Sequence, residues 1–137
     1  MPHDPARVAD TRSWLTKADM DYRAAAFDLT AVPPFAADIV FHAQQAAEKA
    51  LKGYLAWHDV PFRKTHDLVE IGRQCANIDA SLEPLLARAA PLTAYAWKFR
   101  YPGEAEEPTR EEAERALALA REVYDAIVVR LPENARP

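Results

Sequence analysis

The stretch FHAQQAAEKALKGYL, residues 41–55, decides the fold of this chain. It lies within a longer run, residues 35–58, that is rich in alanine, glutamine, glutamate and lysine, all of which are strong helix formers. At about 100° of rotation per residue, one half of the predicted helix is apolar and carries Ala36, Ile39, Ala43, Ala46, Ala47, Ala50, Leu51, Tyr54 and Leu55. The sequence therefore predicts a long helix whose alanines let neighbouring helices approach closely.

The other half of the same predicted helix is polar, with His42, Gln45, Glu48, Lys49 and Lys52. Such a face offers hydrogen-bond donors and cations to a phosphate or a base. It also contains ordinary i,i+4 pairs, such as Glu48 with Lys52, that any solvated helix displays. A solvated surface is the simpler interpretation, and a binding face is the alternative.

Helical periodicity continues on both sides of this stretch. Residues 11–30 place their apolar side chains at steps of three and four, which predicts one buried stripe. A short helix is predicted from about His66 to Ala76, with Thr65 as its candidate N-cap.

Two further helices follow in the second half of the chain. One is predicted from Ser81 to just before Pro102, and Pro91 should kink or split it. The last helix opens at Thr109, which forms a capping-box pattern with Glu112.

The composition excludes several fold classes. The chain has 137 residues with 3 glycines and 11 prolines, too few glycines for the many tight turns of a hairpin-rich β-protein. We therefore predict an all-α, up-and-down bundle of four to five helices in a single domain, residues 11–131, between flexible tails at residues 1–10 and 132–137.

Charge and hydropathy limit the cellular locations and binding partners that we expect for this protein. No uncharged run exceeds nine residues, so no membrane span is expected. The first ten residues lack the apolar core of a signal peptide, and Cys75 has no partner for a disulfide, which together favour a cytoplasmic location. The net charge of −4 gives the whole chain no attraction to nucleic-acid phosphates, so such a role would need a local patch.

Recognised metal and cofactor motifs are missing from the sequence. His42, His58, His66 and Cys75 are scattered rather than set at ligand spacing, so we expect no metal site. The three glycines lie too far apart to form a phosphate-binding loop, so classical nucleotide-hydrolase and dinucleotide folds are excluded and no cofactor is expected.

One short segment interleaves aromatic and basic residues, Trp97-Lys98-Phe99-Arg100-Tyr101. Surfaces that stack single-stranded nucleic acid have this composition. The simpler interpretation is that its two cations sit at a helix C-terminus, where they complement the helix dipole.

Taken together, four blocks of the sequence resemble the HEPN domain family. They are WLTKADMDYRAAAFDL (14–29), FHAQQAAEKALKGYL (41–55), PFRKTHDLVEI (61–71) and FRYPGE (99–104), in the order and spacing of the family. The resemblance covers nearly the whole chain. It implies a helical bundle that usually dimerises, associates with nucleotides or RNA, and is often encoded beside a minimal nucleotidyltransferase as a toxin and antitoxin pair.

The resemblance also supplies a test of ribonuclease activity. Active ribonuclease members carry an Arg-x(4–6)-His motif late in the bundle. Counted from Arg100, the histidine would stand at Ala105, Glu106 or Glu107, and the motif is absent. The chain is thus similar to the subgroup that has Arg-Tyr-Pro at this place, and no enzymatic activity is expected.

The resulting hypothesis is a non-catalytic, homodimeric module that binds a nucleotide or a nucleotidyltransferase partner. Its candidate ligand-binding residues are Arg100, Tyr101, Lys52, Lys49, Gln45 and His66, with Arg100 and Lys52 on phosphate and Tyr101 stacked on a base. Two alternatives remain open: a divergent ribonuclease toxin that uses Arg100 and His66, and a dimeric scaffold protein without a ligand.

Overall fold

The computed structural model describes residues 3–103 and 106–137, and over these ranges every regular element is a helix. The predicted all-α class is therefore confirmed. The elements are α1 (Pro5–Asp28), α2 (Ala36–Trp57), α3 (Leu68–Ile78), η1 (Ala80–Leu82), α4 (Glu83–Ala89), η2 (Ala90–Ala96), α5 (Arg110–Val128) and η3 (Glu133–Ala135), where η denotes a 3₁₀ helix.

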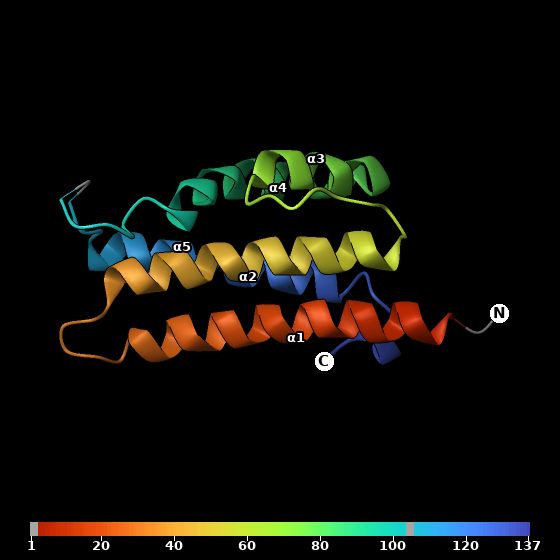
Figure 1. Cartoon of the computed structure of the whole chain (residues 1–137), viewed down its shortest axis with the longest axis horizontal. Coiled ribbons are helices and arrows are strands. Elements are labelled where there is room, and N and C mark those ends of the chain that lie inside the picture. The colour runs from red at the N-terminus through yellow and green to blue at the C-terminus, as the bar shows by residue number, and fades with distance from the viewer. Residues whose placement is uncertain (1–2, 104–105) are drawn as a thin grey trace.

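Helix α2 occupies the centre of the bundle. Figure 1 shows α1 along one side of it, α5 behind it and the shorter α3 and α4 along the other side. Helix α1 runs antiparallel to α2, and α5 returns along it after the shorter helices, so the topology is up-and-down. No helix in the described ranges is both long and apolar enough to cross a membrane.

The two chain ends are more ordered than the sequence predicts. Helix α1 begins at Pro5 rather than near Thr11, because Asp4 accepts a hydrogen bond from the backbone of Ala6 at 3.0 Å and proline is tolerated in a first turn. At the other end, Ala135 is fully buried, and the side chain of Arg12 donates to a backbone carbonyl of residue 134. Residues 5–10 and 133–135 thus belong to helices rather than to tails.

Helix α3 starts two residues later than predicted. Asp67, not Thr65, is its N-cap, and its carboxylate accepts from the backbone of Val69 at 2.9 Å. Thr65 instead accepts from the backbone of Asp67 at 3.1 Å and shapes the turn before the helix. The hydroxyl of Thr93 accepts from the backbone of Leu68 at 3.0 Å, which fixes this turn against η2.

The predicted fourth helix is split, as the position of Pro91 indicates. It becomes α4 and η2, because a proline at the start of η2 cannot donate to the preceding helical turn. Regular structure ends at Ala96, so residues 97–101 lie in turns and not in the last turn of a helix. Gly103 follows at a φ of 79°, a conformation that favours glycine.

Helix α5 begins where the capping pattern predicts. The hydroxyl of Thr109 accepts from the backbone of Glu112 at 3.1 Å. The side chain of Glu112 does not complete the reciprocal box. Its carboxylate accepts from the hydroxyl of Tyr95 at 2.8 Å, which ties α5 to η2.

The core lies on all sides of α2. The predicted apolar half is buried from Ile39 to Leu55, but Glu48 and Lys52 from the predicted polar half are also buried, at 3% and 6% exposure. The interpretation of this face as solvated is wrong for these two residues, because α1 and the segment before α3 cover them.

Glycine is required where α1 and α2 cross. A Cβ at Gly53 would clash with the side chain of Leu15 and lie 3.1 Å from the Cβ of Trp14. The absence of a side chain lets α1 approach the middle of α2 closely.

Candidate functional site

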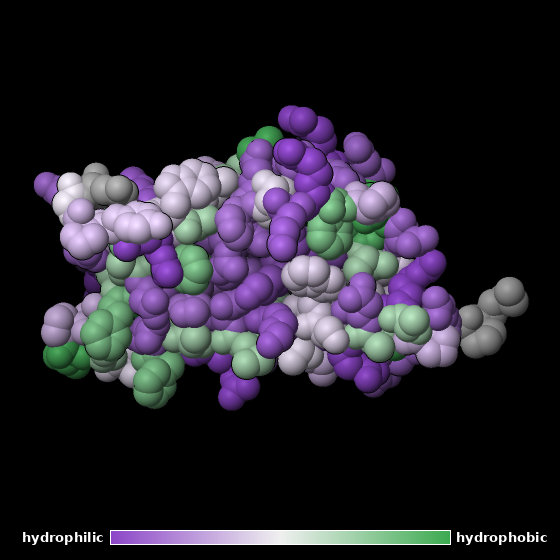
Figure 2. Space-filling view, viewed as in Figure 1, coloured by the Kyte–Doolittle hydropathy of each residue, from purple (hydrophilic) through white to green (hydrophobic). Residues whose placement is uncertain are grey.

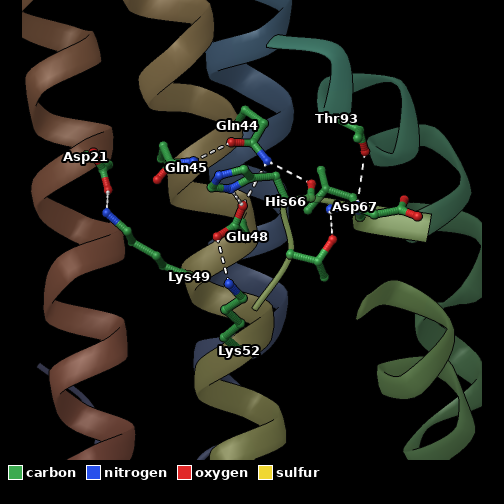
Figure 3. A network of polar contacts seen from close by, with 11 residues as sticks. Asp21, Gln44, Gln45, Glu48, Lys49, Lys52, His66, Asp67 and Thr93 are labelled. Atoms are coloured by element: carbon green, nitrogen blue, oxygen red, sulfur yellow. Dashed lines mark hydrogen bonds and ion pairs between the residues drawn. The ribbon is translucent and has the colours of Figure 1, made fainter. Parts of the chain in front are cut away.

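A buried polar cluster occupies the middle of α2. We call it the Glu48 cluster, and it comprises Gln44, Glu48, Lys52 and His66 (Figure 3). The first three residues lie at i, i+4 and i+8 on one face of the helix, and His66 reaches them from the turn before α3.

Glu48 is the centre of this cluster. One of its carboxylate oxygens accepts from the ammonium of Lys52 at 2.9 Å. The other oxygen accepts from the side-chain amide of Gln44 at 3.1 Å and faces Nδ1 of His66 at 2.7 Å. A carboxylate this deeply buried requires such partners, because burying an uncompensated charge is very costly.

Aromatic rings enclose the cationic end of the cluster. Nζ of Lys52 lies 5.7 Å from the ring centroids of both Trp14 and Phe62, which themselves pack edge to face. Lys52 is therefore held by Glu48 and by the faces of two rings. With 6% of the residue exposed, its ammonium cannot reach an external ligand directly in this conformation.

His66 connects the buried cluster to solvent. Its side chain is 59% exposed although its Nδ1 contacts the buried carboxylate of Glu48. Its backbone carbonyl also accepts from the amide of Gln44 at 3.2 Å, so the residue is fixed at two points. Because a carboxylate accepts from Nδ1, the proton resides on that nitrogen and the other ring nitrogen, Nε2, faces outward as the group available to a ligand.

Gln45 and Lys49 lie beside the cluster, on the side of α2 that faces α1. The amide of Gln45 donates to the side-chain oxygen of Gln44 at 2.7 Å. The ammonium of Lys49 donates to Asp21 of α1 at 2.6 Å, and both side chains are part-buried. Figure 3 shows that Lys49 points away from the cluster toward α1.

Arg100 and Tyr101 occupy a separate position, in the turns that follow η2. The guanidinium of Arg100 lies 4.0 Å from the ring centroid of Phe41, near the start of α2. The ring of Phe99 stacks on Tyr95 with centroids 6.0 Å apart, which anchors the turn to η2. Tyr101 is 64% exposed, so its ring is open to a stacking partner.

A surface pocket adjoins this turn. It has a volume of about 450 Å³, and its lining includes Phe35 and Asp38 from the start of α2 together with Phe99 and Arg100. Its lining carries both charge signs, because Asp38 and Glu107 oppose Arg100 there.

One face of α2 connects the two positions. Arg100 contacts Phe41 and His66 contacts Glu48, and these two residues lie seven positions apart on the same side of the helix, about 10 Å along its axis. Figure 2 shows a hydrophilic band across the middle of this face of the molecule. Gln45, Lys52 and His66 thus join one network through Gln44 and Glu48, whereas Arg100 contacts α2 at Phe41, about two helical turns from Glu48.

Gln44, Glu48 and Asp21 organise this face, although none of them was predicted as a ligand-binding residue. The available signal was the spacing of Gln44, Glu48 and Lys52 at successive i+4 positions. No pattern in the sequence links Asp21 to Lys49, since only the packing of α1 on α2 brings them together. Ala105, one of the three positions for a ribonuclease histidine, lies outside the described residues, whereas Glu106 and Glu107 are exposed.

Comparison with known proteins identifies the family. No curated protein and no solved structure matches the chain significantly. The family model described as the HEPN domain matches residues 11–131, which is most of the chain and includes both the Glu48 cluster and Arg100. The chain therefore belongs to the HEPN domain family of nucleotide- and RNA-related modules.

Proposed function

We propose that this protein is a non-catalytic nucleotide-binding module that holds its ligand along the α2 face between His66 and Arg100. The observation that carries the proposal is the exposed imidazole of His66, fixed at Nδ1 by the buried carboxylate of Glu48. The contact with Glu48 sets the orientation of the imidazole before a ligand arrives, and such preorganisation lowers the entropic cost of binding.

Arg100 supplies the second contact of the proposed site. A guanidinium presents a planar set of donors that matches phosphate oxygens, and its flat face packs on the ring of Phe41 at 4.0 Å. That packing restricts the side chain before the ligand arrives. The exposed ring of Tyr101 lies next in sequence, where it can stack on a base.

Lys49 and Lys52 contribute to the proposed site indirectly, through their ion pairs with neighbouring carboxylates. Lys52 compensates Glu48 and keeps that carboxylate in place for His66. Lys49 is bonded to Asp21 and is 25% exposed, so it contributes positive potential and becomes a direct ligand if the pair with Asp21 opens. The side-chain amide of Gln45, one helical turn before Lys49, is bonded to Gln44 and offers a further polar contact beside the cluster.

The ribonuclease alternative draws on the same histidine. A histidine backed by a buried carboxylate has the form of a general base, and Arg100 could stabilise the developing charge on a phosphate. However, RNA cleavage requires both groups at one phosphodiester, and the α2 residues that they contact, Glu48 and Phe41, lie about 10 Å apart along the helix. This separation favours an extended ligand that is bound over a single phosphate that is cleaved.

The proposed module acts as a homodimer and pairs with a minimal nucleotidyltransferase in a toxin-antitoxin-like system. Membership in the HEPN domain family supports this part of the proposal. Size-exclusion chromatography with light scattering tests the dimer, and the reading frame next to the gene tests the partner. A monomeric chain without an adjacent nucleotidyltransferase gene would remove this part and leave the ligand site standing.

Calorimetric titration of AMP, ATP and a short single-stranded RNA into the purified protein tests the ligand site. We expect saturable binding by the wild type that weakens about tenfold or more in Arg100→Ala, which loses a charge-assisted contact to phosphate, and in His66→Ala, which loses an oriented hydrogen-bond acceptor; tenfold corresponds to about 1.4 kcal/mol. Lys98→Ala is the matched control, because Lys98 is also an exposed cation, two residues from Arg100, and its ammonium lies over the ring of Phe99 rather than on α2.

Three outcomes separate the candidate functions. Binding lost in both site variants but kept in the control supports the proposed module. Cleavage of the RNA by the wild type, abolished by His66→Ala, replaces it with the ribonuclease. The absence of any binding or cleavage by a stable dimer leaves the scaffold interpretation.

A further inference from the structure

Three possible metal-ligating side chains meet where α1 ends and α2 begins. They are Asp28, the last residue of α1, and Asp38 and His42, one turn apart in α2. One ligand atom from each lies within 4.8 Å of the others, and Nε2 of His42 is 3.5 Å from a carboxylate oxygen of Asp38. None of the three belongs to the ligand-binding residues proposed above.

A fourth residue fixes the direction of the imidazole. Asp21 accepts at Nδ1 of His42 with a separation of 2.8 Å, and its other oxygen is bonded to Lys49 at 2.6 Å. The proton of a neutral His42 therefore sits on Nδ1, and the lone pair of Nε2 points toward the carboxylates. Metal-binding histidines are oriented in this way by a carboxylate behind them.

Asp28 provides an independent observation. Its Oδ2 is buried, and no described residue donates a hydrogen bond to it. A buried acceptor without a donor costs about 1–3 kcal/mol. The carboxylate of Asp38 lies close to it, and a cation bound between the two groups would compensate both.

We propose that Asp28, Asp38 and His42 form a binding site for a divalent transition-metal ion. One imidazole nitrogen and two carboxylate oxygens suit Zn²⁺, Mn²⁺ or Co²⁺. Metal-ligand bonds of about 2.0–2.2 Å place donors about 3–4 Å apart, which the 3.5 Å separation of Asp38 and His42 already satisfies. A small side-chain adjustment brings in Asp28.

The site is open to solvent on one side. The side chain of Asp38 is 47% exposed and that of His42 is 25% exposed, so an ion can enter without rearrangement of the helices. Three protein ligands leave at least one coordination position for water or an anion. Asp38 also lines the pocket beside Arg100, which is where such an anion would sit.

Calorimetric titration of ZnCl₂ and MnCl₂ into the metal-stripped full chain, without nucleotide, tests the proposal. We expect one ion per chain and at least a tenfold loss of affinity in His42→Ala and in Asp28→Asn. His58→Ala is the control, because His58 is an exposed histidine at the other end of α2. With Co²⁺, the wild type should show visible absorption bands that His42→Ala changes.

Several results would overturn the metal site. Absence of saturable binding by the wild type is one, and binding that His42→Ala and Asp28→Asn leave intact is another. Asp38→Asn guards against a loss through misfolding, since this more exposed residue should weaken binding while the circular dichroism spectrum stays unchanged. Because the probe is the metal alone, these results are independent of nucleotide binding.

Discussion

The Glu48 cluster and the turn that carries Arg100 each place a basic side chain against aromatic rings, but the first is buried and the second is exposed. In the cluster, Lys52 is buried and bonded to Glu48 and lies against two rings. In the turn, Arg100 is exposed and packs on the single ring of Phe41. A cation in the first setting is part of the framework, whereas a cation in the second is available to a ligand.

We therefore expect the buried cluster to determine the stability of the fold and the exposed turn to determine ligand binding. Removing one member of a buried charged network leaves the others without compensation, so the free energy of unfolding should fall steeply. Removing an exposed cation costs little stability, because water replaces its contacts. The following predictions test this division, from the largest expected change to the smallest.

Glu48→Ala should cause the largest loss. It leaves the buried ammonium of Lys52 without its carboxylate and releases His66, which we expect to lower the free energy of unfolding by about 3–5 kcal/mol. Urea denaturation followed by circular dichroism measures the change. Glu122→Ala is the control, because Glu122 makes an exposed ion pair with Arg88, and its loss should cost less than about 1 kcal/mol. Equal losses in the two variants would contradict the framework role.

Gly53→Ala tests the close approach of α1 that covers the cluster. The added methyl group would clash with Leu15, and overpacking of this kind costs about 1–3 kcal/mol. Gly72→Ala is a matched change in another helix. Its Cβ would lie 3.5 Å from Leu86, an ordinary contact, so the lower flexibility of alanine should raise stability by about 0.5–1 kcal/mol. Opposite signs in urea denaturation would confirm that the α1–α2 crossing at Gly53 requires glycine and that the position of Gly72 does not.

Arg100→Ala should have a small effect on the fold. A cation packed on an aromatic ring at an exposed site contributes about 0.5–1 kcal/mol, and no more than this should be lost. Thermal or urea denaturation measures the change alongside the calorimetric titrations described above. A loss as large as that of Glu48→Ala would show that the turn is part of the framework and would weaken its assignment as a ligand site.

A part-buried network at Asp79 provides the last prediction, which is a pH test. Hydrogen bonds from Ser81 and Arg130 lower the pKa of Asp79 to about 2. A carboxylate whose pKa is lower in the folded state adds stability above its ordinary pKa of 3.8, and this stability is lost as the pH falls toward 2. Asp79→Asn should therefore be less stable than the wild type at pH 5, and the difference should shrink by pH 3. A difference that is unchanged over this range would contradict the shift.

Much of the fold was predictable because local signals carry it. The apolar stripes of α1, α2 and α5, the break at Pro91 and the N-cap at Thr109 each depend on residues close together in the sequence. The predicted starts of α1 and α3 were wrong because more than one nearby residue can cap each helix. Asp67 and Thr65 are both capable N-caps, and Asp4 with Pro5 starts α1 earlier than its apolar stripe begins.

The candidate site was only partly predictable. The residues selected from the sequence include His66 and Arg100, but not the buried groups that fix His66. Helical periodicity identifies a polar face and does not say whether another segment covers it. The contacts between Asp21 and both His42 and Lys49 join residues of α1 and α2 at least 21 positions apart, and no spacing rule predicts them.

The sequence by itself determined the helical class, the approximate positions of the helices and the family, because helix formation depends on propensity, periodicity and capping within a few residues. Only the tertiary structure decided that Glu48 and Lys52 are buried, that His66 is anchored and that Asp28 faces Asp38 and His42. The burial and charge compensation of a side chain depend on which segments pack over it, and that packing is a property of the whole bundle.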